Sequence, residues 1–338
     1  MMNVAINGFG RIGRLFFRAA MQDKEFKNKF EVVAVNDLMD TKTLSHLLKH
    51  DSNFGSYPSE VTYDENSITV DENRIQVFAE RDPSKLPWKK MEIEYTLEST
   101  GYFRKREDAA KHLQAGAKRV VISAPGRGEM DATIVMGVNH DIYDPKKHFI
   151  ISMASCTTGS LSPPCKILND SFGIESGLLT TVHGYTNDQR LLDFPHSDLR
   201  RARAAAINII PTTTGAAAAV GLVIPELQGK MDGRALRVPV PTGSISDITC
   251  ILKKKTTVNE VNAVLKKAAN SSMKGFMQYT EEPIVLRDIV GNTHSAIIDG
   301  DLTLMIGNLV KIFSWYDNEW GYSNRLADLM KFMASKEG

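Results

Sequence analysis

Short apolar runs alternate with longer helical patterns through the first half of the chain. The run Val4-Ala5-Ile6 precedes a glycine-rich turn and then residues 14–21, whose composition suits a helix. Further apolar runs end at small polar residues near Asp37, Thr100 and Ser123. Strands that alternate with helices favour a parallel sheet. The pattern predicts a doubly wound α/β domain, in which ligands bind beyond the carboxyl ends of the strands.

Several other segments predict further helices, strands and a hairpin. Residues 40–60 predict a helix and a loop, and residues 60–70 with 74–78 predict a hairpin excursion. Residues 133–136 and 149–152 read as two more strands that lead to Cys156. Residues 161–172 have helical spacing despite two adjacent prolines.

Composition narrows the class of protein. The chain has 338 residues, enough for about two domains. Its 41 Lys and Arg nearly balance its 40 Asp and Glu, so no overall field attracts nucleic acid or an anionic membrane. The three cysteines form no CxxC pair, so neither a disulfide framework nor a metal site is expected. No leader or long apolar run is evident, and we expect a cytoplasmic protein.

The turn after the first strand has the spacing of a dinucleotide site. Gly8 permits the turn, Gly10 lets the backbone approach a pyrophosphate, and Gly13 lets the helix pack on the strand. Asp37 follows the next apolar run, 24 positions after Gly13, close to the usual spacing of about 20. A carboxylate there binds a ribose hydroxyl and repels a 2′-phosphate, which favours NAD over NADP. The alternative is an aspartate that merely closes a strand.

Cys156 stands at the junction between a strand and a helix. At a helix N-terminus, free N–H groups and the dipole favour the thiolate, so we expect a lowered thiol pKa. The alternative is a buried small apolar residue, which is our interpretation of Cys165 and Cys250.

His183 ends a β-rich run at residues 178–182. A histidine and a cysteine on neighbouring strand ends form a pair in which the imidazole takes the thiol proton. The other seven histidines do not end a strand beside a candidate nucleophile. They lie in helical, loop or charged sequence contexts: His46, His50, His112, His140, His148, His196 and His294.

Two further segments suit anions. Thr214-Gly215 opens an alanine-rich helix, and Arg237 adds a fixed positive charge. Residues 198–203 carry three arginines, but without interleaved aromatic residues they do not favour nucleic-acid binding. Two anion sites beside a thiol predict a phosphorylated substrate and a second phosphate or acidic partner.

These motifs together resemble phosphorylating glyceraldehyde-3-phosphate dehydrogenase. The resemblance spans essentially the whole chain, in collinear order. The resemblance rests on the His183 strand with Thr186, on the tail at residues 314–323 and on eight short motifs. These motifs are NGFGRIGR (7–14), VNDL (35–38), ESTG (98–101), ISAP (122–125), ASCTT (154–158), DLRRARAA (198–205), TTTGAA (212–217) and RVP (237–239).

The resemblance implies a role for each matching residue. Cys156 is the expected nucleophile, and His183 the expected base and thiolate partner. Residues expected to contact NAD, besides the three glycines, are Arg11, Ile12, Asp37, Arg81, Ser123 and Asn318. Thr186 and Arg237 are expected to hold the substrate phosphate. Inorganic phosphate is expected to meet Ser155, Thr157, Arg201, Thr214 and Gly215.

The resemblance also implies architecture and reaction. A Rossmann-type NAD-binding domain (1–155, completed by 319–338) is expected beside an α+β catalytic domain (156–318) with a mixed, largely antiparallel sheet. A homotetramer is expected, with residues 184–208 reaching a neighbouring subunit's cofactor. D-glyceraldehyde 3-phosphate, NAD and inorganic phosphate would give 1,3-bisphosphoglycerate through a Cys156 thiohemiacetal and thioester.

The chain departs from the family where CTTNC is usual. Gly159 and Ser160 replace the amide and the second cysteine, and Gly159 with the Pro163-Pro164 pair is expected to loosen the first helical turns.

Two alternatives remain besides this family. Erythrose-4-phosphate dehydrogenase is a related enzyme, although Thr186 and its HGYT context resemble the glyceraldehyde-phosphate enzyme. A nucleotide- or RNA-binding role as the main function is the other. An NADP-dependent isoform is opposed by Asp37 and by Phe194-Pro195.

Overall fold

A computed structural model describes residues 1–337, which divide into two compact units. The first unit contains residues 1–134, 141–153 and 323–337, and the second contains residues 135–140 and 154–322. The C-terminal helix α9 (Trp320–Glu337) begins in the second unit and runs into the first.

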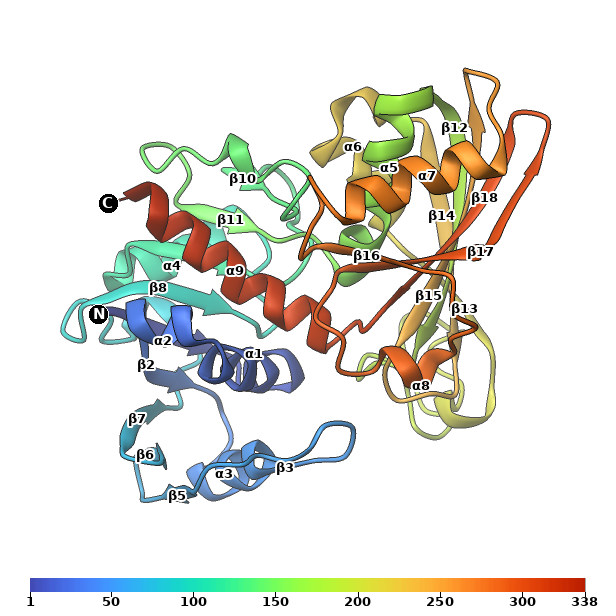
Figure 1. The fold of residues 1–338 in the computed structure, drawn as a ribbon. Helices are drawn as coiled ribbons and strands as arrows, with labels where there is room; N and C mark the ends of the chain where they lie inside the picture. The colour runs from blue at the N-terminus through green and yellow to red at the C-terminus, as the bar shows by residue number, and fades with distance from the viewer. Residues whose placement is uncertain (338) are drawn as a thin grey trace. The chain divides into compact units, whose positions relative to one another are not determined.

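A nine-stranded sheet forms the centre of the first unit (Figure 1). Its central strands β1, β2 and β8 are buried along most of their length, because helices cover both faces of the sheet. Seven strands run parallel, and an antiparallel hairpin extends one edge, as the sequence predicted. In spatial order the strands are β10 (Ala132–Thr133), β11 (Ile150–Ser152), β9 (Arg119–Ile122), β8 (Ile93–Glu98), β1 (Met2–Asn7), β2 (Phe30–Asn36), β7 (Asn73–Phe78), β6 (Ser67–Val70) and β5 (Val61–Tyr63).

Helices cover both faces of this sheet. Figure 1 shows α4 and α9 on opposite faces, the doubly wound arrangement that the sequence predicted. Lys331 of α9 donates to Asp23, the residue that caps α2. The helices are α1 (Arg11–Gln22), α2 (Lys24–Lys29), α3 (Thr41–Lys49) and α4 (Arg106–Ala115), with short 3-10 turns at Pro83–Lys85 and His140–Ile142 and a small ribbon of β3 (His50–Asp51) and β4 (Gly55–Ser56).

The second unit is built on a seven-stranded mixed sheet. Four of its six strand pairings are antiparallel, so the prediction of a mixed, largely antiparallel sheet is confirmed. In spatial order the strands are β13 (Ile210–Thr213), β14 (Met231–Val238), β12 (Ile174–Gly184), β15 (Ser244–Leu252), β18 (Leu309–Tyr316), β17 (Ala296–Ile306) and β16 (Met277–Thr280).

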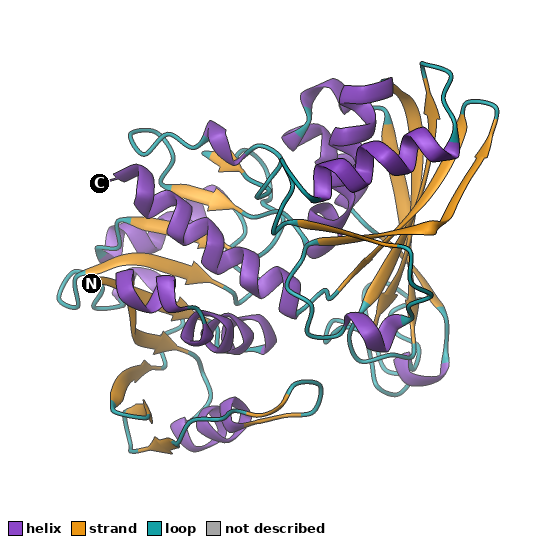
Figure 2. Ribbon diagram, in the orientation of Figure 1, coloured by secondary structure: helices purple, strands orange, loops and turns teal. Residues whose placement is uncertain are grey.

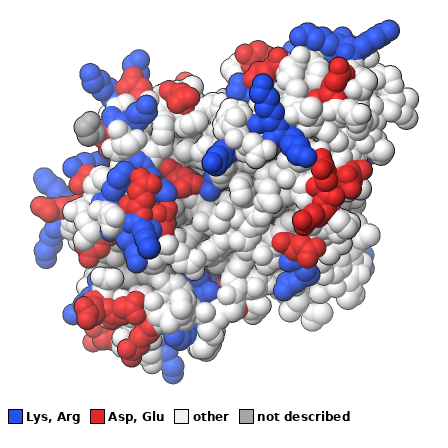
Figure 3. Space-filling model, viewed as in Figure 1, with Lys and Arg blue, Asp and Glu red and all other residues white. Residues whose placement is uncertain are grey.

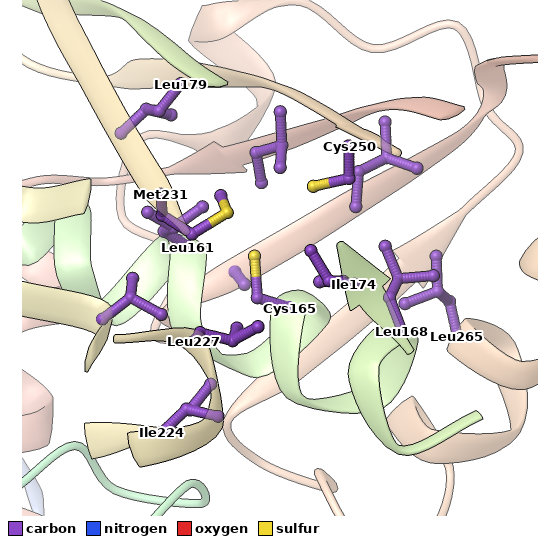
Figure 4. Close-up of a cluster of buried hydrophobic side chains, with 14 of the residues drawn as sticks. Leu161, Cys165, Leu168, Ile174, Leu179, Ile224, Leu227, Met231, Cys250 and Leu265 are labelled. Carbon is purple, nitrogen blue, oxygen red and sulfur yellow. The ribbon is translucent and has the colours of Figure 1, made fainter. Parts of the chain in front are cut away.

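Helices cover one face of this second sheet, as the colours of Figure 2 make clear. Inward positions of β15 alternate with half-buried ones, which is typical of a sheet with one face on the core. Cys165 and Cys250 lie inside that core, among leucines and isoleucines (Figure 4). The helices are α5 (Cys156–Phe172), α6 (Ala216–Val223), α7 (Val258–Ala269) and α8 (Leu286–Ile289), with 3-10 turns at Ala205–Ile207 and Pro225–Leu227.

Charges of both signs are mixed over the face drawn in Figure 3, as expected for a net charge of +1. Among residues 1–337, no helix is both long and apolar enough to cross a membrane. Within the same residues, no group of three or more His, Cys, Asp or Glu side chains is arranged to hold a metal ion.

Candidate active site

Glycine is needed at different positions of the first turn for different structural reasons. Gly8 has a φ of +90°, and a Cβ there would lie 2.7 Å from the Thr100 nitrogen. A Cβ on Gly13 would lie 2.2 Å from the Gly8 carbonyl oxygen, because α1 packs directly on the turn. Gly10 is different, since a Cβ there would meet nothing within 4 Å. That open space at the start of α1 is where a phosphate could approach the backbone N–H groups.

Alanine substitutions separate these roles. Gly13→Ala should lower the free energy of unfolding by about 1–3 kcal/mol, because the added methyl overlaps the Gly8 carbonyl. Gly10→Ala should leave the urea midpoint close to wild type and weaken dinucleotide binding, which titration calorimetry measures. Equal loss of stability in the two variants would contradict this division.

A cavity of about 560 Å³ lies beside this turn. Among the residues that line it are Asn7, Gly8, Gly10, Asp37, Arg81 and Thr100. Asp37 Oδ2 accepts the Phe9 N–H at 2.7 Å, and its Oδ1 accepts the Met39 N–H at 3.1 Å. A carboxylate has about four acceptor positions, so Asp37 can still receive ribose hydroxyls. The donors at the start of α1 and this acceptor fit the phosphates and ribose of NAD.

The other predicted cofactor residues lie at several places. Arg11 and Ile12 begin α1, and the Arg11 side chain is paired with Asp51. Ser123 directly follows β9, with its N–H bonded to the Glu98 carbonyl at 2.9 Å. Asn318 belongs to the second unit, where its Oδ1 accepts the Gly243 N–H at 2.9 Å and the Ser244 hydroxyl at 3.1 Å. With its oxygen engaged, this amide presents its NH₂ group as the donor.

Cys156 is the first residue of α5. The preceding backbone turns sharply, because Ala154 has a φ of +52°, a left-handed conformation that is costly for a residue with a side chain. Ser155 then caps the helix by accepting the Thr158 N–H at 3.0 Å. This junction fixes the thiol at the positive end of the helix.

His183 lies at the end of β12, beside the thiol. Its Nε2 is 3.6 Å from the Cys156 sulfur. Its Nδ1 lies 2.7 Å from both the Gly184 carbonyl oxygen and Arg237 Nη1. The carbonyl only accepts and the guanidinium only donates, so a neutral ring satisfies one of them at a time. With the proton on Nδ1, the free electron pair of Nε2 faces the sulfur, which is the arrangement of a base.

Burial governs the charges of this pair. Burial raises the pKa of the Cys156 thiol, and the Arg237 charge lowers it by less. The prediction of a lowered thiol pKa is therefore wrong for this environment, because desolvation outweighs the charges around the sulfur. Burial and the Arg237 charge lower the pKa of His183 to about 3. Both partners are thus neutral at pH 7, so the thiol must give up its proton as it reacts.

The low pKa of His183 predicts a loss of stability in acid. An unfolded histidine binds a proton near pH 6.5, whereas native His183 stays neutral down to about pH 3. Stability is therefore lost as pH falls through this window, by about 1–2 kcal/mol between pH 6.5 and 5. Between pH 6.5 and 5, His183→Asn should lose about 1–2 kcal/mol less of its free energy of unfolding than wild type, because asparagine does not titrate. Urea unfolding at both pH values measures the two losses, and identical losses in the two proteins would contradict the low pKa of His183.

The predicted anion residues lie in the second unit. Thr157 is buried on α5, and Thr214-Gly215 precedes α6. Arg201 is paired with Asp188 at 3.4 Å, and the Thr186 hydroxyl donates to the same carboxylate. Arg237 is the predicted phosphate residue that the structure brings directly to His183.

Two residues of β18, Tyr316 and Ser314, make contacts near the thiol that the sequence did not predict. The Tyr316 hydroxyl lies 2.8 Å from both Thr157 Oγ1 and Thr181 Oγ1, which ties α5 to β12 behind Cys156. Ser160 Oγ lies 2.9 Å from Ser314 Oγ, whose hydroxyl also lies 3.3 Å from the Ser160 carbonyl.

The Ser314 contact bears on the expected loosening of α5. Pro164 has no N–H to bond the Ser160 carbonyl, so Ser314 supplies the donor that the proline lacks. The helix runs unbroken through both prolines.

Both halves of the chain match families of known proteins. Residues 2–106 match "Glyceraldehyde 3-phosphate dehydrogenase, NAD binding domain", and residues 155–318 match the C-terminal domain of the same enzyme. A glyceraldehyde-3-phosphate dehydrogenase from Thermotoga maritima is 59% identical over 334 residues, which cover 98% of this chain and 99% of the relative. One from Geobacillus stearothermophilus is 57% identical over 336 residues, and "Glyceraldehyde-3-phosphate dehydrogenase 2" from Streptomyces avermitilis is 55% identical over 336; each match covers 99% of both chains. The resemblance that the motifs indicated is confirmed: the chain belongs to the glyceraldehyde-3-phosphate dehydrogenase family, whose cofactor is NAD.

Proposed function

We propose that the protein is the phosphorylating enzyme of glycolysis, which oxidises D-glyceraldehyde 3-phosphate with NAD and inorganic phosphate to 1,3-bisphosphoglycerate. The observation that carries this proposal is the 3.6 Å approach of the Cys156 sulfur to His183 Nε2 at the start of α5. A thiol with an adjacent neutral imidazole is equipped for covalent chemistry at an aldehyde carbon.

The first step is addition of Cys156 to the aldehyde. The sulfur bonds to the carbonyl carbon while its proton passes to Nε2 of His183, giving a thiohemiacetal. The imidazolium and the Cys156 backbone N–H stabilise the developing oxyanion. Nε2 then returns this proton to the oxyanion, which completes the thiohemiacetal hydroxyl, and the neutral imidazole takes the hydroxyl proton as the carbon is oxidised. The chemistry that NAD supplies when bound is acceptance of the hydride from this carbon.

Substrate phosphate gives Arg237 a second partner. While Arg237 donates to Nδ1, Nε2 carries the proton and cannot act as a base. A phosphate engaged by Arg237 and Thr186 draws the guanidinium away, and Nδ1 then donates to the Gly184 carbonyl. Nε2 is left to accept the thiol proton, so binding of the phosphorylated substrate prepares the base.

Inorganic phosphate completes the reaction. One of its oxygens attacks the thioester carbon, the carbon–sulfur bond breaks, and the thiolate recovers its proton from His183. We assign this phosphate to Ser155, Thr157, Arg201, Thr214 and Gly215. Residues that we assign to NAD are Gly8, Gly10, Arg11, Ile12, Gly13, Asp37, Arg81, Ser123 and Asn318.

We also propose the expected domain division, with residues 1–155 and 319–338 binding NAD and residues 156–318 carrying the catalytic residues. We propose a homotetramer on the basis of exposed apolar surface in the second unit. Leu178, Ile251 and Leu309 are exposed, and the strand register places them on the face of the sheet opposite to the buried Ile248 and Cys250. Leucines 191, 192 and 199 are more than 70% exposed on the loop at residues 184–208. Apolar surface of this kind marks contacts between proteins. A cytoplasmic location fits the three free cysteines.

Asp37 tests the cofactor preference. Asp37→Ser should reduce kcat/KM with NAD by about 10- to 100-fold, because a charged hydrogen bond to ribose is worth roughly 1.5–3 kcal/mol. It should raise kcat/KM with NADP, because the repulsion of a 2′-phosphate is removed. Steady-state kinetics with both cofactors measure the two effects, and an unchanged NAD-to-NADP ratio would overturn this role.

The reaction itself is tested by NADH formation from glyceraldehyde 3-phosphate with and without inorganic phosphate. Erythrose 4-phosphate and NADP serve as alternative substrate and cofactor. We expect turnover to require phosphate and to be fastest with glyceraldehyde 3-phosphate and NAD. Equal steady-state rates without phosphate would remove the phosphorylating assignment, and faster turnover of erythrose 4-phosphate would favour the related enzyme.

A further inference from the structure

A buried polar network links the carboxyl ends of three strands in the first unit. Asn7, Asn36 and Glu98 end β1, β2 and β8, and Asn7 is in register with each of the others. Asn7 Nδ2 donates to Glu98 Oε2 at 2.6 Å, and Asn36 Nδ2 donates to Asn7 Oδ1 at 2.7 Å. All three side chains are at most 5% exposed. The network therefore fixes the strand ends beside the dinucleotide cavity.

His112 and Trp88 extend this network away from the cavity, and both are wholly buried. The Trp88 indole N–H donates to His112 Nδ1 at 3.0 Å. An indole nitrogen can only donate, so Nδ1 must accept and the ring proton lies on Nε2. Nε2 then donates to Glu98 Oε2 at 3.1 Å. The helical sequence context of His112 shows neither of these partners, because Trp88 and Glu98 lie in two other segments of the chain.

Glu98 connects this network to the Thr100 loop, which lines the cavity. Its Oε1 accepts the Thr100 N–H at 2.9 Å and also the Thr100 hydroxyl. Together with Asn7 and His112, these donors give the buried carboxylate four hydrogen bonds, which offset the cost of its burial. Thr100, Asn7 and Asn36 all line the cavity beside Gly8 and Asp37.

We propose that Glu98, His112 and Trp88 are positioning residues for NAD: they hold the Thr100 loop and the strand ends in the shape that receives the dinucleotide. This inference rests on the proposed assignment of the cavity to NAD. The three residues act through Thr100 and Asn7, and no direct contact with the cofactor is assigned to them.

Two leading substitutions test this arrangement. Glu98→Gln replaces one carboxylate oxygen, which accepts hydrogen bonds, by an NH₂ group, which can only donate. That NH₂ group would then face the donor of either Asn7 or Thr100 without forming a hydrogen bond. His112→Leu removes both ring contacts at similar volume, whereas His112→Gln keeps an acceptor for Trp88 and a donor for Glu98. Tyr95→Phe is the matched control: Tyr95 lies on the same strand as Glu98, and the variant loses a partly buried hydrogen bond of 2.9 Å from the hydroxyl to Glu337, away from the cavity.

The readout is the equilibrium Kd for NAD, measured by titration calorimetry without substrate, beside the thermal unfolding midpoint. We expect Glu98→Gln and His112→Leu to raise Kd about tenfold, as loss of a buried charged hydrogen bond would. We expect His112→Gln and Tyr95→Phe to keep a Kd close to that of wild type, and kcat at saturating NAD to change less than Kd. Trp88→Phe removes only the indole donor and should raise Kd about threefold if the other variants fail to fold.

Unchanged Kd in folded Glu98→Gln and His112→Leu, or in Trp88→Phe where those two do not fold, would overturn the inference. An equal rise in Tyr95→Phe would also overturn it, because the effect would then be general destabilisation. Failure of wild type to bind NAD would overturn the cofactor site and this inference together. Phosphate-independent oxidation would overturn the proposed reaction alone, because Kd is measured without aldehyde or phosphate.

Discussion

Replacing Cys156 by serine should reduce phosphate-dependent NADH formation by at least about 10⁴-fold, the scale of losing a catalytic nucleophile. A serine hydroxyl is a far weaker nucleophile than a thiol, and a neutral imidazole has to deprotonate a much weaker acid. The fold should survive, because serine is close to cysteine in size and the sulfur contacts are long, at 3.6 Å to His183 Nε2 and 4.0 Å to Thr157 Oγ1. Initial rates with saturating substrates measure the effect.

Cys165 supplies the matched control for this substitution. It lies on the same helix but is wholly buried in the core with Cys250. Cys165→Ala should lower the thermal midpoint and leave the rate per folded subunit near wild type. Alkylation of wild-type protein with iodoacetamide should abolish turnover through Cys156. Substantial activity in Cys156→Ser would show that the thiol is not the nucleophile.

Replacing His183 by asparagine should reduce kcat by about 10²–10⁴-fold, the usual contribution of a general base. The thiol then keeps its raised pKa but loses the imidazole that takes its proton. Alkylation of Cys156 by iodoacetamide at pH 7 should slow as well, because that reaction needs the same proton transfer. Raising the pH should restore part of the alkylation rate, since hydroxide can replace the imidazole.

His196 gives a control for His183. It lies on the loop at residues 184–208, and its Nδ1 accepts the Asp198 N–H at 2.8 Å, away from the thiol. His196→Asn should retain near-wild-type kcat. A His183→Asn enzyme with wild-type kcat and alkylation rate would contradict the role of the pair.

The sequence predicted the parts of the site that depend on neighbours in the chain. Gly8, Gly10 and Gly13 lie in one turn, and Asp37 follows the next strand, so spacing alone was enough to predict a dinucleotide site there. Cys156 and His183 each end a recognisable strand-to-loop pattern. Family membership and fold class were predicted because many such motifs occur in order, and both are confirmed.

The rest depended on contacts between distant segments. His112 meets Trp88 and Glu98 across 24 and 14 positions, so its helical context gave no sign of a network. Ser160 meets Ser314 across 154 positions. The thiol pKa was predicted in the wrong direction because the helix start is visible in sequence and the depth of burial is not.

The proposed mechanism requires a thioester on Cys156 that inorganic phosphate then cleaves. To test it, the protein is mixed with glyceraldehyde 3-phosphate and NAD without phosphate, and intact and peptide masses are measured after an acid quench. We expect one 3-phosphoglyceroyl group per chain, on the peptide that contains Cys156. When phosphate is added before the quench, we expect this group to be lost and 1,3-bisphosphoglycerate to be released. A burst of NADH without that adduct, or an adduct on another residue, would contradict this mechanism.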